Sequence, residues 1–220
     1  PLQSSSAASD VYKRQVMPMA DEKVKILNNV GDILVTKYGG DWINFIDDGP
    51  KKLYDNGKGL VERLVRDFKR FDDHSIFENE KVYFLKLAQL AFWGIHRELS
   101  KRYFYIEDME NMTAFADYII PVALESFGIV KYSSELKEKI DSGILIDKDS
   151  TEEIEIRSTS IYATAKLTEL INNYKKEEEK IIIPQLDFKI WTDFHADERP
   201  HHLTKTIMSV SYTHLRAHET

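Results

Sequence analysis

The chain of 220 residues, 42% of them hydrophobic, is long enough for one domain with a sizeable core, and no segment approaches the roughly 18 uninterrupted apolar residues of a membrane span. Its 37 acidic residues outnumber the 30 basic ones and give a net charge of −7, which disfavours binding to intact RNA or DNA. The absence of cysteine excludes disulfides, thiolate nucleophiles and cysteine zinc sites and is compatible with a reducing cytoplasm, where we expect the protein.

The two ends of the chain differ in composition from the middle. Residues 1–16 are small, polar and aperiodic and lack the apolar core of a signal peptide, while residues 209–220 follow a well-patterned segment abruptly. Both ends resemble translated cloning or adapter sequence. We therefore predict a non-native or disordered leader and tail around one domain at residues 17–208, and we leave the tail residues His214 and His218 out of any site.

Two amphipathic helices are predicted in the first third of this domain. Apolar residues at helical spacing mark the first helix from about Asp21, and Gly39 and Gly40 end it. After a short turn at Trp42 and a polar loop, the same spacing predicts a second helix over residues 60–71.

The next two segments predict buried helices. Residues 81–99 are apolar on most sides, which is typical of the central helix of a bundle. Residues 112–127 form a further apolar run that Gly128 ends. Because Pro121 lies inside this run, we expect either a helix start displaced towards it or a kink.

Two capped helices should follow. Ser133 or Ser134 can cap a short helix. Ser150 with Glu153 forms a capping-box pattern, which predicts the start of a long helix that ends near Tyr174.

The last part of the domain predicts one more helix. The charged run at residues 175–180 indicates a solvated connection, and Pro184 opens the final helix. Weak strand signals occur only at residues 144–146 and 181–183. The predicted fold class is therefore all-α, as a single helical domain.

An aspartate lies between aromatic residues in the segment Phe115-Ala116-Asp117-Tyr118. A carboxylate in apolar surroundings needs a donor or a cation close by, although a single exposed aspartate on a helix gives the same pattern. Lys86 lies in the most apolar predicted helix, where it either meets a buried partner or extends its charge to the surface.

Two further pairs of residues are candidates for a site. Glu155 and Arg157 are two positions apart and cannot pair on one helix face, so they should contact different partners. The alternative to a role in a site is that they form structural ion pairs with other helices. Asp187 and Trp191 are four positions apart and share a face. They could offer a base a hydrogen-bond acceptor beside an aromatic plane, or they could be a core tryptophan and an aspartate that stabilises the helix start.

We predict no metal site. His195, His201 and His202 lie in a loop without the helical spacing or cysteine partners that make such sites specific. The sequence also has no glycine-rich phosphate loop, nucleophile elbow or dinucleotide fingerprint.

Several sequence segments resemble, in their order along the chain, the queuosine salvage protein family. They are KILNNVGDIL with KYGG, FENEKVYFLKLAQL, MTAFADYIIP, GIVKYSSEL, EEIEIRSTS, PQLDFKIW and PHHLTKTIM. Together they extend over most of the interpretable region, and their shared order is far more specific than any one segment.

The resemblance implies an α-helical fold related to DNA glycosylases and hydrolysis of queuosine 5′-monophosphate to queuine and ribose 5-phosphate, without a metal or organic cofactor. Asp117 of the FADY motif would be the catalytic carboxylate. Positions that match the family in or beside the pocket are Lys86, Phe115, Glu155, Arg157, Asp187 and Trp191. Tyr118 joins this substrate-binding set, and so does Lys131, which with Lys86 and Arg157 is a candidate phosphate ligand on charge grounds.

The implied chemistry suits a carboxylate. Cleavage of an N-glycosidic bond builds positive charge on C1′, which an anion at position 117 would stabilise in the transition state, either by covalent attack or by holding an activated water. Queuine also carries a cationic secondary amine, which Asp187 or Glu155 could bind. The expected partner is this small nucleotide, not nucleic acid or a membrane.

The chain also departs from the family pattern. Ile119 stands where the family usually has arginine, so a contact to a phosphate or carboxylate is missing or replaced. The family's proteins are longer at the N-terminus, and we expect a truncated domain. The rival hypotheses are a non-catalytic helical scaffold, from which a buried Asp117 would distinguish an enzyme, and a glycosylase acting on another nucleoside or on nucleic acid.

Overall fold

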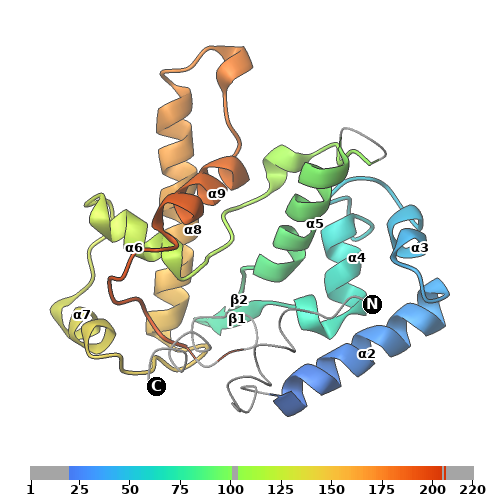
Figure 1. The fold of residues 1–220 in the computed structure, drawn as a ribbon, viewed down its shortest axis with the longest axis horizontal. Helices are drawn as coiled ribbons and strands as arrows, with labels where there is room; N and C mark the ends of the chain where they lie inside the picture. Colours follow the sequence, from blue (N-terminus) through green and yellow to red (C-terminus); the bar gives the residue numbers. More distant parts are fainter. Residues whose placement is uncertain (1–19, 101–103, 205, 207–220) are drawn as a thin grey trace.

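The computed structural model describes residues 20–100, 104–204 and 206, so the predicted leader (1–16) and tail (209–220) lie outside the described residues. Within these ranges the chain is mainly helical, as predicted (Figure 1). Its α-helices are α2 (Ala20–Tyr38), α3 (Trp42–Asp47), α4 (Leu60–Asp67), α5 (Lys86–Leu99), α6 (Ile119–Ser126), α7 (Ser134–Asp141), α8 (Thr151–Asn172) and α9 (Ile183–Phe194). Short 3-10 helices are η1 (Lys69–Phe71), η2 (Met109–Asn111) and η3 (Glu177–Glu179), and a hairpin is formed by β1 (His74–Phe77) and β2 (Glu80–Tyr83).

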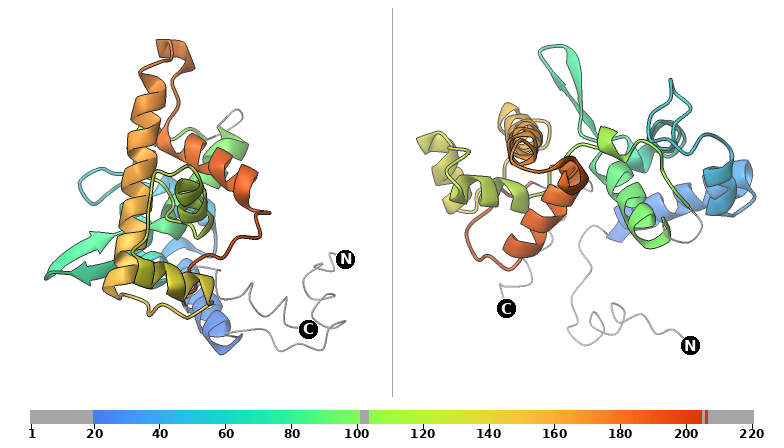
Figure 2. Two further views of the ribbon diagram at one scale, coloured as in Figure 1. Left: turned by 90° about the vertical axis from the view of Figure 1, so that its left-hand side faces the viewer. Right: turned by 90° about the horizontal axis from the view of Figure 1, so that it is seen from above.

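The helices form two groups that lie on opposite sides of the molecule (Figures 1 and 2). In the first group, α2 packs on α3 and α4 packs on α5; in the second, α6, α8 and α9 pack on one another. The first group encloses the largest apolar cluster, which includes Phe45, Leu64 and Phe92, and the second encloses a smaller one around Ile120 and Leu124. Strand β1 contacts α8, so the hairpin connects the groups.

The helix predicted over residues 81–99 begins only at Lys86, and its predicted start was wrong. Glu78 and Asn79 both have positive φ (49° and 68°), and Phe77 pairs with Glu80 across them. Two-residue turns with this backbone match the twist of antiparallel strands, so the chain forms a hairpin before the helix. The remainder, α5, is the predicted helix.

The helix predicted over residues 112–127 is also shorter. It begins at Ile119, so Pro121 is its third residue, where the amide has no intrahelical partner to lose. Of the two expected alternatives, a displaced helix start and a kink, the structure shows the displaced start. Gly128, with φ of +71°, follows the last turn, as predicted.

Both predicted serine caps are present. Ser133 Oγ accepts a hydrogen bond from Leu136 N at the start of α7, and Ser150 Oγ accepts one from Glu153 N at the start of α8. The carboxylate of Glu153, however, accepts from Asp149 N, so the reciprocal half of the predicted capping box is displaced by one residue.

The two weak strand signals have different outcomes. Leu145 forms an isolated parallel bridge with Leu203, whereas residues 181–183 lead into α9. Among the described helices, none combines the length and the apolar character needed to cross a membrane.

Candidate active site

An ion pair joins the two helical groups where they meet. Nζ of Lys86, the first residue of α5, lies 2.8 Å from Oδ2 of Asp117, which lies just before α6. The two side chains are 5% and 13% exposed, so both charges are largely removed from water. A buried charge without a partner is strongly unfavourable, and the opposite charge offsets much of that cost. Asp117 is therefore not a solvated surface aspartate.

The backbone before each member of this pair has an unusual conformation. Leu85 (φ 50°) and Ala116 (φ 46°) are left-handed and directly precede Lys86 and Asp117. Such conformations cost roughly 1 kcal/mol or more in a non-glycine residue and occur often at functional sites. Oδ1 of Asp117 accepts a hydrogen bond from Ile119 N at 3.0 Å, so both oxygens of this carboxylate are held in place.

A second carboxyl group lies in the same region. Asp187 of α9 is 2% exposed, and its Oδ2 accepts a hydrogen bond of 2.9 Å from Phe115 N. Burial raises the pKa of Asp187 to about 7; the Phe115 amide opposes the rise, Asp117 adds to it and Lys86 opposes it. At neutral pH this group therefore exchanges readily between acid and carboxylate, and it can donate or accept a hydrogen bond.

Arg157 of α8 is held by two acidic residues. Its Nη1 and Nη2 donate to the two oxygens of Asp73 at 3.0 and 2.6 Å, and Nη1 lies 3.4 Å from Oε1 of Glu153. The guanidinium also lies over the ring of Phe84, 3.8 Å from its centroid. Burial raises the pKa of Glu153, and Arg157 opposes this rise. Since all these charged side chains are buried, Arg157 is committed to this network.

Sequence reasoning missed Asp73. Its carboxylate also accepts a hydrogen bond from Lys86 N at 3.2 Å, and its backbone oxygen accepts from the amides of Phe84 and Leu85. Asp73 therefore fixes the start of α5 and connects it to Arg157 of α8. Its sequence context, two aspartates in a polar loop, is too common to indicate such a role.

Two of the predicted aromatic residues flank Asp117 in sequence. Phe115 is 4% exposed and belongs to the largest apolar cluster. Tyr118 is half-buried, and its ring centroid lies 4.7 Å from that of His201. Burial raises the pKa of Tyr118, and the charge of Asp117 adds to this rise.

The other predicted substrate-binding residues are more exposed. Trp191, which directly follows the buried Ile190 in α9, is 38% exposed and stacks on His195 with centroids 5.0 Å apart. Lys131 is exposed in the connection between α6 and α7. Glu155 is exposed on α8, on the face away from Arg157, so the structure does not bring Lys131 or Glu155 into the buried network.

A histidine that sequence reasoning considered only as a metal ligand is close to these charges. His202 is 6% exposed, and burial lowers its pKa to about 3. His201 contributes to this decrease, Asp117 opposes it, and Arg157 and Lys86 contribute further. The described part of the chain contains no group of three or more acidic or histidine side chains suited to a metal ion.

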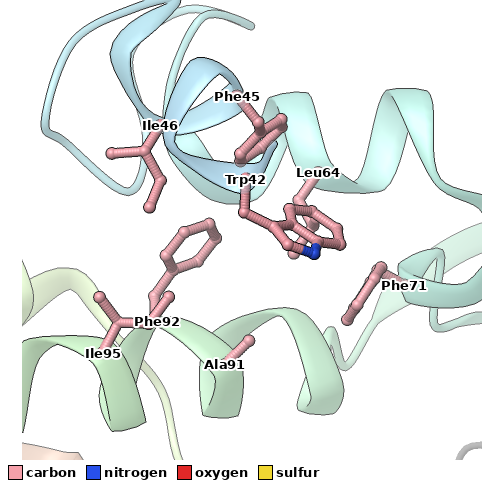
Figure 3. A pocket seen from close by; sticks show the side chains of 8 residues that line it. All are labelled: Trp42, Phe45, Ile46, Leu64, Phe71, Ala91, Phe92 and Ile95. Atoms are coloured by element: carbon pink, nitrogen blue, oxygen red, sulfur yellow. The ribbon is translucent and has the colours of Figure 1, made fainter. Parts of the chain in front are cut away.

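An apolar pocket of about 340 Å³ lies elsewhere in the first helical group (Figure 3). It is lined by Trp42, Phe45, Ile46, Leu64, Phe71, Ala91, Phe92 and Ile95. The three lining residues from α5 project from the face of the helix opposite Lys86. With no charged group in its wall, this pocket cannot bind a sugar phosphate and is separate from the buried ion pair.

Comparison with known proteins gives the chain its family. The model of the family described as "Queuosine salvage protein" matches residues 4–209. A mouse (Mus musculus) protein named queuosine 5′-phosphate N-glycosylase/hydrolase is 30% identical over 204 residues, 87% of this chain and 58% of that protein. Proteins of the same name from Bos taurus and Schizosaccharomyces pombe are each 31% identical, over 87% and 80% of this chain and 58% and 48% of their own lengths. The chain thus spans about half the length of these curated relatives, and it belongs to the queuosine salvage protein family.

Proposed function

We propose that the protein hydrolyses the N-glycosidic bond of queuosine 5′-monophosphate and releases queuine, with Asp117 as the catalytic carboxylate. The observation that carries this proposal is the buried Lys86–Asp117 ion pair at the boundary between the two helical groups. Ligand sites are common at such boundaries, and the names of the relatives supply the substrate and the reaction. Burial of Asp117 is the feature that favours an enzyme over a non-catalytic scaffold.

Asp117 supplies a fixed negative charge for the reaction. As the bond from C1′ to the base breaks, positive charge grows on the sugar, and an anion that is already oriented stabilises this state without reorganisation. Lys86 and Ile119 N hold the two carboxylate oxygens. Asp117 then acts as a nucleophile at C1′ or as the group that holds the attacking water. In both routes the water oxygen ends on C1′ and a proton ends on the departing base nitrogen.

Queuine places additional requirements on the site. It lacks the N7 atom that ordinary purine hydrolases protonate, so its departure depends more on stabilisation of the sugar. Its secondary amine is cationic, and Asp187 is the buried carboxyl group suited to bind it, since a neighbouring cation favours the charged form. Phe115, Tyr118 and Trp191 are the proposed apolar and aromatic contacts to the base.

The 5′-phosphate needs cations or amide donors. Lys86 is the candidate that contacts the reacting carboxylate directly. Arg157 is paired with Asp73 and Glu153, and Lys131 is exposed outside the buried network. Lys86 is therefore our first choice among the three, and Glu155 and Lys131 remain peripheral candidates for the substrate.

The proposed reaction requires only water and no metal or organic cofactor. The proposed place of action is the cytoplasm. The proposal also specifies a small nucleotide rather than intact nucleic acid as the substrate, which the net charge of −7 supports.

The test is to incubate the purified protein with queuosine 5′-monophosphate and to quantify queuine and ribose 5-phosphate by chromatography. The mouse relative serves as the positive control, and guanosine 5′-monophosphate serves as the negative control substrate. We expect equal amounts of both products from queuosine 5′-monophosphate alone. Turnover by the mouse protein with none by the full-length protein would contradict the proposal.

A further inference from the structure

The described segment around His202, near the C-terminal end of the chain, lies between elements that are distant from it in sequence. Leu203 forms a parallel bridge with Leu145, and its backbone oxygen accepts a hydrogen bond of 2.8 Å from Ile146 N. On the other side, the ring of His201 lies against Tyr118, the residue after Asp117. These two contacts fix the segment beside the start of α6.

His202, in the middle of this segment, is buried with one ring nitrogen left without a partner among the described residues. It is 6% exposed, and its Nδ1 has no hydrogen-bond partner within the described part of the chain. Buried polar atoms in folded proteins nearly always have a partner, and an exception requires an explanation. A ligand that supplies the missing partner is one such explanation, because sites for small molecules keep a few polar groups available on a buried wall.

The groups around His202 are those of the candidate active site. The charged residues that act on it are Lys86 of α5, Asp117 before α6 and Arg157 of α8, besides its neighbour His201. Lys86, Asp117 and Arg157 come from three different elements, and each is close enough for its charge to act on His202. His202 therefore lies near the place where these elements meet. Burial together with two nearby cations keeps its imidazole neutral, and the pKa is lowered to about 3.

We infer that His202 is a substrate-binding residue that hydrogen-bonds a ribose hydroxyl of the nucleotide beside Asp117. This inference rests on the proposed function. A neutral imidazole offers one N–H donor and one lone pair, which suits a hydroxyl that can both donate and accept. It has no charge to offer a phosphate, and Asp117 is the group assigned to the anomeric carbon, so the adjacent hydroxyls at C2′ and C3′ are the substrate groups within reach.

Rates with modified substrates test this inference. The protein and a His202→Phe variant are each assayed with queuosine 5′-monophosphate and with its 2′-deoxy and 3′-deoxy analogues. We expect the substitution to reduce kcat/KM for the ribonucleotide by roughly 10- to 100-fold, the range for a hydrogen bond lost at a buried group. For the analogue that lacks the bonded hydroxyl, the two proteins should differ by less than about 3-fold, because the same hydrogen bond cannot be lost twice.

Variants and a matched control keep the test independent of folding. If His202→Phe does not fold, His202→Leu, which likewise cannot form the hydrogen bond, replaces it. His202→Asn and His202→Gln retain an amide near Nδ1 or Nε2, and at least one of them should recover part of the rate. The control is His96→Phe in the last turn of α5, a half-buried histidine whose Nδ1 also lacks a partner, and it should leave all rates unchanged.

The outcomes separate this inference from the proposed function. An equal reduction with all three substrates would mean that His202 only supports the fold, and it would overturn the inference alone. A wild-type protein that does not release queuine would overturn both.

Discussion

Lys86 and Asp117 are 31 positions apart, yet their side chains meet at 2.8 Å and each directly follows a residue with left-handed backbone. One belongs to the first helical group and the other to the second. The pair is therefore produced by the way the two groups meet, and the buried contact between Asp73 and Arg157 crosses the same boundary.

Replacing the carboxylate of Asp117 separates its proposed catalytic role from its structural one. Asp117→Asn should lower the rate of queuine release by at least about 100-fold, the scale of one lost transition-state stabiliser. It should also lower the free energy of unfolding by about 3 kcal/mol, because Lys86 is left buried without its partner. Both are measured, the first by chromatography and the second by urea unfolding.

Adding Lys86→Met to Asp117→Asn should recover most of the stability and none of the activity, since the uncompensated charge is removed but the anion is still missing. The matched control is Asp193→Asn, which changes an exposed aspartate paired with Lys189 and should leave turnover unchanged. Recovery of activity in the double variant would exclude Asp117 as the catalytic carboxylate.

The stability of the protein should depend on pH through Asp187. Folding raises the pKa of this acid from 3.8 to about 7, so between these values the folded state binds a proton that the unfolded state has lost. The contribution of Asp187 to the free energy of unfolding therefore falls as pH rises from about 4 to 7 and is level above that. Asp187→Asn cannot ionise and should match the wild type near pH 4 but exceed its stability by up to about 4 kcal/mol near pH 8.

Urea unfolding of both proteins at pH 4, 6 and 8 checks this prediction, and the quantity of interest is the difference between them at each pH. The asparagine oxygen can still accept the hydrogen bond from Phe115 N, so packing is preserved. A difference that does not change with pH would show that Asp187 is not protonated on folding.

Removal of Arg157 should destabilise the fold because it leaves two buried carboxylates without a cation. Arg157→Met deletes the cation that contacts Asp73 and Glu153, and both carboxylates stay buried. We expect a loss of about 3–5 kcal/mol in the free energy of unfolding, measured by urea denaturation.

The comparison for Arg157 is Arg199→Met, which removes an arginine paired with Asp197 at the surface and should leave the urea midpoint almost unchanged. Similar midpoints for the two variants would show that the Asp73–Arg157 contact is not a buried structural pair.

Two glycine substitutions should have opposite effects on stability. A Cβ at Gly59 would lie 2.3 Å from the backbone oxygen of Leu53, so Gly59→Ala requires the backbone to move and should prevent cooperative folding. Gly94 lies on the exposed side of α5 with no atom within 4 Å of its Cβ position, and Gly94→Ala should stabilise the protein by about 1 kcal/mol through helix propensity. Thermal melting followed by circular dichroism measures both, and a folded Gly59→Ala with an unchanged midpoint would contradict the first.

The helix starts that could be predicted were those marked by a capping serine or a proline in the first turn. Ser133 and Ser150 cap their helices because a hydroxyl reaches an amide three residues away, and Pro121 displaced the start of α6 as expected. The hairpin before α5 was missed because Val82 and Phe84 suit a buried helix as well as a strand. Its only local signal was Asn79, a residue that tolerates positive φ.

By itself the sequence determined the helical class, most of the helix ends and the candidate residues, because spacing, caps and motif order depend on positions close together in the chain. Only the tertiary structure decided which candidates meet: Lys86 with Asp117, Phe115 with Asp187, and Arg157 with the unforeseen Asp73. It also left Glu155 and Lys131 outside this network and placed His202 among its charges. The physical reason is that charge pairing and desolvation depend on distances across the boundary between two helical groups, which no local pattern encodes.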